Sequence, residues 1–217
     1  MGTLCINELF WSLQGEGTLS GQPAFFIRLQ GCPGACSFCD TRYAQKRDPK
    51  KKLAQSASSL FQKKKHDETY GEIACADLVA EIAARIPYKI AVIITGGEPF
   101  AQDIHELQDL LTKNHYPIHI ETSGFYPVYG EHAWITLSPK RHGFVEANWE
   151  RADEIKLVVR TEEDIVPYQP YIQAMPSKRI LLQPIDQDKE ATKLCVELCK
   201  KYNWRLSIQM HKYINIQ

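Results

Sequence analysis

The amino-acid sequence predicts an α/β fold, an abbreviated TIM-like barrel of parallel βα units in a single domain. Short β-branched segments alternate with segments whose apolar residues recur at helical spacing, which is typical of parallel βα units. The sequence contains about seven such strands, enough for a barrel or part of one. Glycine-rich and polar residues follow the strands, so we expect a site at the carboxyl end of the sheet.

The elements follow from these patterns in order along the chain. The expected strands lie in the segments 23–30, 89–99, 117–124, 133–140, 154–160, 179–186 and 204–210. Each is a short apolar or β-branched run that glycine, proline or polar residues end. The expected helices are 74–86, 101–115 and 189–202, where apolar residues recur every three or four positions.

Composition restricts the class of protein. The chain has 217 residues, 44% apolar and 24% charged, as expected for one globular domain of residues 1–217. The sequence has no run of about 18 apolar residues, so we expect no membrane span. The first residues lack the basic flank and cleavage site of a secretory signal. Seven unevenly spaced cysteines do not suggest a disulfide framework, so we expect a reduced, cytoplasmic protein.

The formal charge of zero conceals an asymmetry. Residues 46–65 carry eight Lys or Arg and one Asp, a net +7, which leaves −7 for the rest of the chain. The stretch 44–70 has weak periodicity, and we expect a basic, solvated and flexible excursion. Nucleic-acid binding is not expected, because Phe61 is almost the only aromatic residue among these charges.

Three cysteines, Cys32, Cys36 and Cys39, lie within eight residues in a stretch that Gly31 and Pro33 make a loop. They could be buried packing residues, ligands of a structural zinc, or ligands of an iron–sulfur cluster. A structural zinc site needs four ligands. Three thiolates without a fourth favour a cube of four irons with one iron open to a ligand.

The other cysteines do not supply an obvious fourth ligand. Cys195 and Cys199 lie at helical spacing beside leucines, so we expect both to face the core. Cys5 and Cys75 are isolated in the sequence and are interpreted as packing residues.

These motifs together resemble a known family. The C-x3-C-x2-C loop with Phe38 before its last cysteine resembles the signature of the radical S-adenosylmethionine (SAM) superfamily, and "GGEP" at 96–99 is similar to its motif for the methionine amino group. "SLQGEG" at 12–17, "CDT" at 39–41 and "HKYINI" at 211–216 resemble the 7-carboxy-7-deazaguanine synthases. The likeness covers nearly the whole chain except the basic segment.

The resemblance implies a radical SAM core and a lyase of queuosine and 7-deazapurine biosynthesis. Such enzymes convert 6-carboxy-5,6,7,8-tetrahydropterin to 7-carboxy-7-deazaguanine and release ammonia. They use a [4Fe–4S] cluster, S-adenosylmethionine and Mg²⁺, usually as homodimers. The cluster also needs an external reductant such as flavodoxin, and the charge of the basic segment would suit an acidic one.

The resemblance also assigns residues. Cys32, Cys36 and Cys39 would hold the cluster. The residues expected to bind S-adenosylmethionine are Phe38, Cys39, Asp40, Gly97, Ser138, Pro139, Lys140, Gln183, Pro184, Ile185 and Asp186, with Glu121 as a further contact. The residues expected to bind the substrate are Leu13, Gln14, Gly15, Arg28, Thr95 and the terminal carboxylate of Gln217. Thr41 would bind Mg²⁺.

Physical arguments accompany three of these assignments. Gly97 would let the backbone approach the methionine part of the cofactor, where a Cβ would obstruct it. The planar fork of Arg28 suits a substrate carboxylate better than a surface ion pair, because Arg28 lies within an apolar strand. The hydroxyl of Thr41 suits hard Mg²⁺, although a Thr at such a position more often caps a helix.

Two other functions share part of this pattern. An activase of a glycyl-radical enzyme would have the cysteine loop and "GGEP" but would not need "SLQGEG", "CDT" or "HKYINI". A non-catalytic iron–sulfur electron carrier, or a zinc-binding module, would normally supply a fourth ligand.

Overall fold

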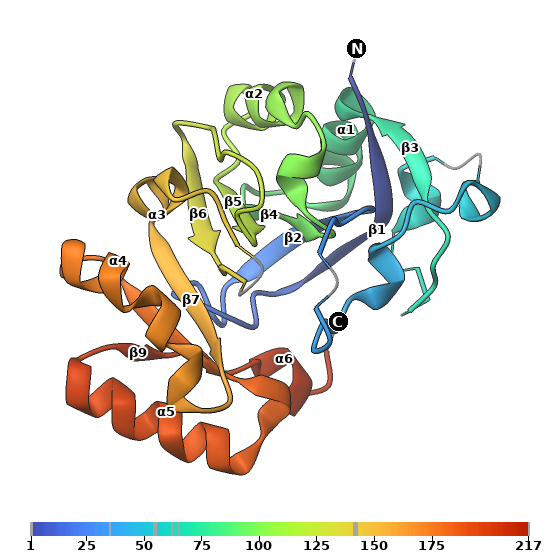
Figure 1. Ribbon diagram of the computed structural model, residues 1–217. Helices are drawn as coiled ribbons and strands as arrows, with labels where there is room; N and C mark the ends of the chain where they lie inside the picture. The colour runs from blue at the N-terminus through green and yellow to red at the C-terminus, as the bar shows by residue number, and fades with distance from the viewer. Residues whose placement is uncertain are drawn as a thin grey trace.

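The computed structural model describes residues 2–34, 36–53, 56–61, 63–64, 66–140 and 143–216. Figure 1 shows a curved sheet with helices around its outer side. The strands are β1 (Thr3–Leu13), β2 (Pro23–Leu29), β3 (Gly71–Ala74), β4 (Ala91–Gly96), β5 (Ile118–Thr122), β6 (Ala133–Leu137), β7 (Glu154–Val159), β8 (Ile180–Pro184) and β9 (Arg205–Leu206). The α-helices are α1 (Cys75–Arg85), α2 (His105–Lys113), α3 (Ala147–Arg151), α4 (Gln169–Ala174), α5 (Lys189–Tyr202) and α6 (Met210–Tyr213).

The described strands form one sheet in the order β3-β1-β2-β4-β5-β6-β7-β8-β9. Every neighbouring pair from β2 to β9 is parallel. This confirms the predicted fold class, a partial TIM-like barrel. β1 pairs antiparallel with both β2 and β3, which the sequence analysis did not predict. Asn7 and Glu8 interrupt the apolar pattern of β1, yet both are buried there.

The predicted helices are present, and α5 has the expected bounds. It begins where the carboxylate of Asp188 accepts a hydrogen bond from the Ala191 backbone N–H at 2.7 Å. It ends at Asn203, whose φ of 55° is left-handed, a conformation that asparagine tolerates. Cys195 is fully buried and Cys199 packs against the same core, which confirms that both thiols face inward. None of the helices in the described ranges is long and apolar enough to cross a membrane.

Alternate residues of β2 face opposite sides of the sheet. Phe25, Ile27 and Leu29 are buried in the core between the sheet and its helices. Phe26 faces the inside of the barrel and stacks on Phe10 with ring centres 4.6 Å apart. Since side chains alternate along a strand, Arg28 is on the same inner side as Phe26. The outer face of the sheet therefore holds the core, and the inner face is left for the site.

The basic segment, residues 46–65, is less solvated than expected. Leu60 is fully buried and Ala57 nearly so, and Phe61 packs against the same core. Phe61 also forms an isolated bridge with Leu9 of β1. The described lysines of the segment are exposed or half-buried. The expectation of a wholly solvated excursion is wrong for these apolar residues, because burying them against β1 removes their surface from water.

Candidate active site

One cavity of about 370 Å³ lies at the carboxyl ends of β2 and of β4 to β8. Its wall contains nearly all the sequence-predicted site residues: Leu13, Gln14, Gly15, Arg28, Cys32, Cys36, Phe38, Cys39, Asp40, Thr41, Thr95, Gly97, Glu121, Ser138, Lys140, Gln183, Pro184, Ile185 and Asp186. Pro139 is not part of this wall, and its carbonyl instead accepts a hydrogen bond from the buried Tyr168 hydroxyl at 3.1 Å. Gln217 lies outside the described residues.

The cysteine loop, residues 31–40, joins β2 to the first 3₁₀ turn. The first residues of the loop are held by the chain that follows it. The backbone N–H groups of Gly31 and Cys32 donate to the carbonyls of Ala44 and Gln45 at 2.7 and 2.8 Å. Burial raises the pKa of the Cys32 thiol, and the charges of Glu98, Cys39 and Cys36 add to the rise although the Gly34 N–H opposes it. A thiolate at Cys32 therefore needs positive charge nearby, which a bound metal group would supply.

The number of thiols also fits an iron–sulfur cluster with an open iron. Cys32, Cys36 and Cys39 all line the cavity. Among the described residues, no other cysteine does so, and Cys195 and Cys199 are held in the core on the other side of the sheet. A structural zinc site would need a fourth ligand that this wall does not offer as a thiol.

The two glycines of "GGEP" allow β4 to end against the cysteine loop. A Cβ on Gly97 would lie 2.1 Å from the carbonyl oxygen of Gly31, and a Cβ on Gly96 would lie 2.6 Å from the backbone of Leu29. Gly96 also has a φ of +109°. The missing side chain of Gly97 thus makes room for the backbone of the cysteine loop.

Glu98 of the same motif connects two strand ends. Its side chain is fully buried and accepts hydrogen bonds from the Thr122 hydroxyl at 2.6 Å and from the Ser123 backbone N–H at 2.9 Å. Its own N–H donates to the Gly31 carbonyl at 2.9 Å. Glu98 therefore joins the ends of β4 and β5 to the cysteine loop and is a structural carboxylate.

Arg28 forms an ion pair, but a buried one. Its Nε lies 2.5 Å from Oε1 of Glu8, which is 1% exposed. The same oxygen accepts a hydrogen bond from the Tyr43 hydroxyl at 3.0 Å. The guanidinium carbon lies 5.3 Å from the ring centre of Phe10, and Thr95 is the neighbour of Arg28 across β4. These contacts fix the orientation of the guanidinium beside the cavity.

Thr41 is at the N-cap position of a 3₁₀ turn but makes no side-chain capping bond. Its hydroxyl oxygen lies 3.5 Å from Sγ of Cys39 and lines the cavity. The common explanation for a Thr after Cys-Asp, helix capping, therefore does not apply. A hydroxyl oxygen is the kind of ligand that Mg²⁺ prefers.

Lys156 of β7 is a central residue that the sequence analysis missed. It is 4% exposed, and its Nζ lies 2.5 Å from Oε2 of Glu16 and 2.7 Å from Oε2 of Glu121. Burial alone would raise the pKa of Glu16, but Lys156 outweighs burial and lowers it to about 2. Burial raises the pKa of Glu121, with Lys156 opposing and Glu16 adding to the rise. The ammonium group of Lys156 thus forms ion pairs with both carboxylates.

A second group of hydrogen-bonded polar side chains lies on β5, β6 and β7, next to Lys156 and its two carboxylates. Nε2 of His119 lies 2.7 Å from the Thr136 hydroxyl, which donates to Oε1 of the fully buried Glu154 at 2.8 Å. Burial lowers the pKa of His119 to about 4, so its ring is neutral near pH 7. Glu121, Thr136 and Glu154 are direct neighbours across β5, β6 and β7. The inner face of these strands therefore carries a row of hydrogen-bonded polar side chains.

The ends of β6 and β8 complete the wall. Lys140 donates from Nζ to the Ser138 hydroxyl at 2.8 Å, and Nζ lies 5.6 Å from the Phe38 ring centre. Burial lowers the pKa of Lys140. After β8, Asp186 adopts a left-handed φ of 49° where the chain turns around the cavity.

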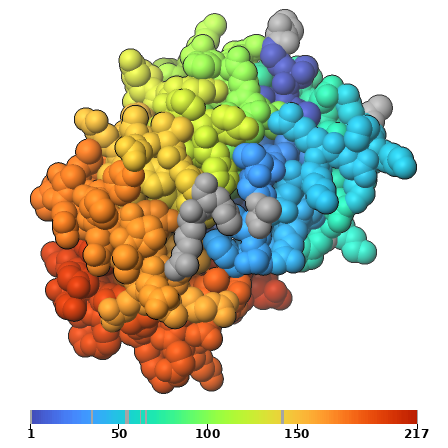
Figure 2. Space-filling view, in the orientation of Figure 1, coloured from blue at the N-terminus to red at the C-terminus, as the bar shows by residue number. Residues whose placement is uncertain are grey.

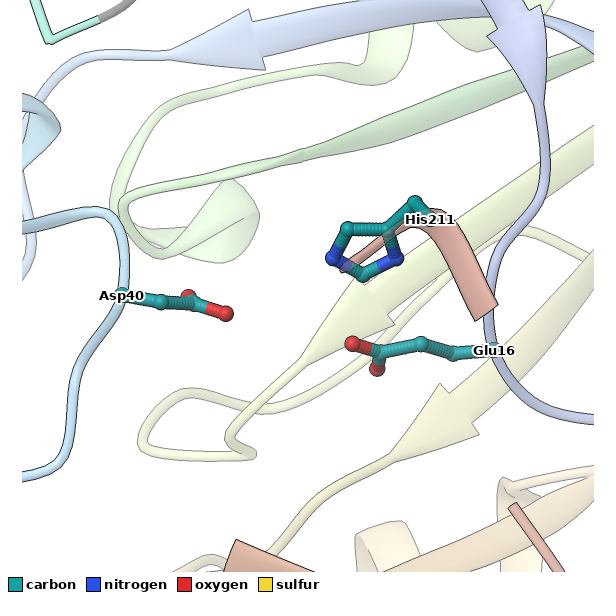
Figure 3. Close-up of side chains that lie close together, drawn as sticks. All are labelled: Glu16, Asp40 and His211. Carbon is teal, nitrogen blue, oxygen red and sulfur yellow. The ribbon is translucent and has the colours of Figure 1, made fainter. Parts of the chain in front are cut away.

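The C-terminal segment closes one side of the cavity. Nε2 of Gln209 donates to Oε1 of Glu16 at 2.8 Å and to Oδ2 of Asp40 at 3.1 Å. Lys212 lies 3.2 Å from the same Asp40 oxygen. Figure 3 shows Glu16, Asp40 and His211 pointing toward one another from three segments, with ligand atoms within 4.8 Å. Because Lys156 and Lys212 already neutralise the two carboxylates, we interpret the group as a polar junction.

The polar residues of β5 and β7 carry a recognisable signal in the sequence. Lys156 is two positions after Glu154, and Glu121 two positions after His119, so each pair lies on one face of its strand. Charged residues alternating with apolar ones in "HIE" and "EIK" could have indicated a polar barrel interior. Gln209 and Lys212 belong to a short segment without a strong periodic pattern.

Comparisons with known proteins agree with this site. The model of the radical SAM superfamily matches residues 26–139. The 7-carboxy-7-deazaguanine synthase of Escherichia coli K12 is 42% identical over 97% of this chain and 98% of its own length. The enzyme of that name from Buchnera aphidicola is 36% identical over 98% of both chains. The crystal structure of QueE from Escherichia coli matches with a TM-score of 0.87 and 40% identity, covering 96% of this chain and 95% of that one.

These similarities extend over almost the full length of the chain. The resemblance found in the sequence is therefore confirmed, and the chain belongs to the 7-carboxy-7-deazaguanine synthase family of the radical SAM superfamily.

Proposed function

We propose that this protein is the radical SAM lyase that converts 6-carboxy-5,6,7,8-tetrahydropterin to 7-carboxy-7-deazaguanine with release of ammonia. The product belongs to queuosine biosynthesis, a tRNA modification pathway. The observation that carries this proposal is that the three-cysteine loop and the expected substrate residues share one cavity in a chain similar over its length to enzymes of that name. A cavity of about 370 Å³ suits small-molecule ligands rather than a protein substrate, unlike the site of an activase.

The cofactors are a [4Fe–4S] cluster, S-adenosylmethionine and Mg²⁺. When bound, they supply the primary carbon radical that removes hydrogen from the substrate, and no amino-acid side chain supplies such a radical. Cys32, Cys36 and Cys39 would hold the cluster. Ser138, Lys140 and the residues 183–186 would surround S-adenosylmethionine, and Thr41 would contribute an oxygen ligand to Mg²⁺.

Arg28 would bind the carboxylate of the substrate. Because Glu8 already accepts from Nε, the two Nη groups are the part of the fork that a ligand would use. Glu8 and Tyr43 hold the guanidinium in place before the ligand arrives. Such preorganisation lowers the entropic cost of binding.

Glu121 would exchange a proton with the substrate. Burial raises the pKa of Glu121, which makes its carboxylate a better proton acceptor and a group that can pass a proton on to the departing amino nitrogen as ammonia leaves. The carboxylate that remains is stabilised by Nζ of Lys156 at 2.7 Å. Lys156 and Glu16 would thus set the protonation of Glu121 without touching the substrate.

We further propose that the protein works in the cytoplasm as a homodimer and takes its electron from a protein reductant such as flavodoxin. The terminal carboxylate of Gln217 would complete the substrate site.

An anaerobic assay tests the function. The reconstituted protein is incubated with dithionite, S-adenosylmethionine, Mg²⁺ and the carboxy-tetrahydropterin, and the deazaguanine and ammonia are quantified. We expect both products in equal amounts, none with Cys36→Ala, and wild-type amounts with the control Cys199→Ala. Cleavage of S-adenosylmethionine without deazaguanine would overturn the proposal.

A further inference from the structure

We propose that Glu154 is a positioning residue for substrate binding: its buried carboxylate holds the backbone of residues 14–18, here the QGEGT turn, at the wall of the cavity. This inference rests on the proposed function, because the turn carries Gln14 and Gly15, which would bind the carboxy-tetrahydropterin. It adds a role for a carboxylate that does not itself line the cavity.

Glu154, the first residue of β7, is fully buried. Lys156, two residues further along the strand, pairs with Glu16 and Glu121 instead. Within the described ranges, neither a lysine nor an arginine forms an ion pair with Glu154. Burying a carboxylate is costly unless hydrogen bonds replace its contacts with water. The groups that donate to Glu154 therefore indicate what it does.

One oxygen of Glu154 is fixed by the sheet. Oε1 accepts a hydrogen bond from the Thr136 hydroxyl at 2.8 Å. Because this hydroxyl gives its proton to Glu154, the Thr136 oxygen is the acceptor for Nε2–H of His119, 2.7 Å away. The hydrogen bonds thus run in one direction, from β5 through β6 to β7, and they set the orientation of the carboxylate.

The other oxygen of Glu154 binds the turn. Oε2 accepts a hydrogen bond from the Thr18 backbone N–H at 3.2 Å. Gly17 packs so closely that a Cβ on it would lie 2.5 Å from Oε1, which Thr136 already holds in place. Figure 1 shows the connection from β1 to β2 passing beside β7. In Figure 2 blue residues of the N-terminal part lie against orange residues of the second half, so the fold brings these distant segments together.

The C-terminal segment holds the turn from the other side. The Gly17 N–H donates to Oγ of Ser207 at 2.9 Å, and the Met210 N–H donates to the Gly15 carbonyl at 2.9 Å. The backbone of the turn is therefore fixed between Glu154 and this segment. A ligand that binds Gln14 and Gly15 would meet a preorganised surface, which lowers the cost of binding.

The first experiment measures hydrogen–deuterium exchange of residues 14–18 in the reconstituted enzyme without pterin, by mass spectrometry. The test variant is Glu154→Met, which has a similar volume but no acceptor. The control is Asp153→Asn, because the neighbouring Asp153 also accepts from a backbone N–H, that of Ile135 at 2.7 Å, but does not contact the turn. We expect exchange about tenfold faster in Glu154→Met and unchanged in the control. Unchanged exchange in Glu154→Met would overturn the proposal.

The second experiment measures by anaerobic calorimetry the Kd of S-adenosylmethionine, and that of the carboxy-tetrahydropterin in its presence. We expect Glu154→Met to weaken pterin binding about tenfold and S-adenosylmethionine binding less than about twofold. KM for the pterin should rise by a similar factor with kcat nearly unchanged. Equal weakening of both ligands would mean a general structural role and would overturn the proposal.

Gly17→Ala gives an independent test, which also applies if Glu154→Met does not fold. Its Cβ would push the turn away from Glu154, so pterin binding should again weaken while S-adenosylmethionine binding is kept. Gly21→Ala is the matched control, because Gly21 lies in the same connection, has a positive φ of 88° and has open space around it. Equal effects of the two substitutions would contradict the proposal. If wild type binds the pterin but forms no deazaguanine, the proposed function is wrong, and the exchange and binding comparisons still decide the role of Glu154.

Discussion

The two halves of the cavity are built by different means. In the half between β2 and β4, here the glycine half, backbone packs on backbone: Gly96 and Gly97 touch Leu29 and Gly31 where side chains would collide. In the half from β5 to β7, here the charged half, ion pairs between side chains form the wall, and Lys156 bridges Glu16 and Glu121. The glycine half tolerates no added atom, whereas the charged half depends on a balance of charges.

The difference indicates how each half fails. A Cβ in the glycine half meets the backbone, which cannot move aside without shifting the cysteine loop. A lost charge in the charged half leaves other ionised groups buried without a partner, and their protonation then changes. The first half should respond to volume and the second to charge and pH.

The largest effect is expected for Lys156→Met. The substitution keeps the volume but leaves Glu16 and Glu121 buried together without a cation, at a cost of about 3–5 kcal/mol at pH 7. Urea unfolding measures it, with Lys156→Arg as the control that keeps the charge. The pH dependence of stability gives a second readout. In wild type the ionised Glu16 stabilises the fold above about pH 4.5, and this stabilisation is lost as pH falls toward 2, because the pKa of Glu16 is lowered to about 2. A variant as stable as wild type at pH 7 would refute the ionic account of this half.

His119 should give the next largest effect, visible only as pH falls. Its pKa is lowered by burial to about 4, while the unfolded chain takes up this proton near pH 6.5. Between these values the unfolded state binds more protons, so stability falls by about 3 kcal/mol from pH 6.5 to 4. His119→Gln should remove this part of the slope, and the exposed His105→Gln should retain it. Equal slopes in all three proteins would show that His119 is not the cause.

Gly97→Ala tests the glycine half. The new Cβ would lie 2.1 Å from the Gly31 carbonyl oxygen, and we expect about 1–3 kcal/mol of destabilisation together with poor iron loading. Gly21→Ala is the matched control, because Gly21 has a positive φ of 88° but no atom within 4 Å. It should show only the backbone strain and full iron loading. Normal iron content in Gly97→Ala would contradict the packing role.

Sequence reasoning predicted the glycine half well and the charged half poorly. The three cysteines and "GGEP" are adjacent in the sequence, and their residue types are unusual enough to indicate chemistry. Lys156, Glu16 and Glu121 come from distant segments, and nothing local in the sequence tells that their side chains meet. That contact depends on the register of β5, β6 and β7, which only the folded sheet fixes.

The fold shows the same division. The parallel strands from β2 to β8 and the bounds of α5 could be predicted. There the spacing of apolar residues agrees with the residues that begin and end each element. β1 could not, since its buried Asn7 and Glu8 disguise it: Glu8 pairs with Arg28, and Asn7 donates to Gln30 at 2.8 Å. Polar residues whose partners lie on other strands look like surface residues in the sequence.

The smallest effect is expected at the C-terminal segment. Lys212 and Asp40 are partly exposed, so Lys212→Ala should cost less than about 1 kcal/mol, and less still at high salt. Urea unfolding at two salt concentrations checks it. If Lys212→Ala lowered the free energy of unfolding as much as Lys156→Met, the charged half would extend into this segment.

The central claim is that three cysteines alone hold an iron–sulfur cluster in this cavity. Metal and sulfide analysis of the anaerobically reconstituted protein tests it most directly, in wild type and in a Cys195→Ala/Cys199→Ala variant. Both should contain about four irons and four sulfides per chain, as a [4Fe–4S] cube requires, and Cys32→Ala should not. Zinc in place of iron, or loss of iron from the Cys195/Cys199 variant, would contradict the account.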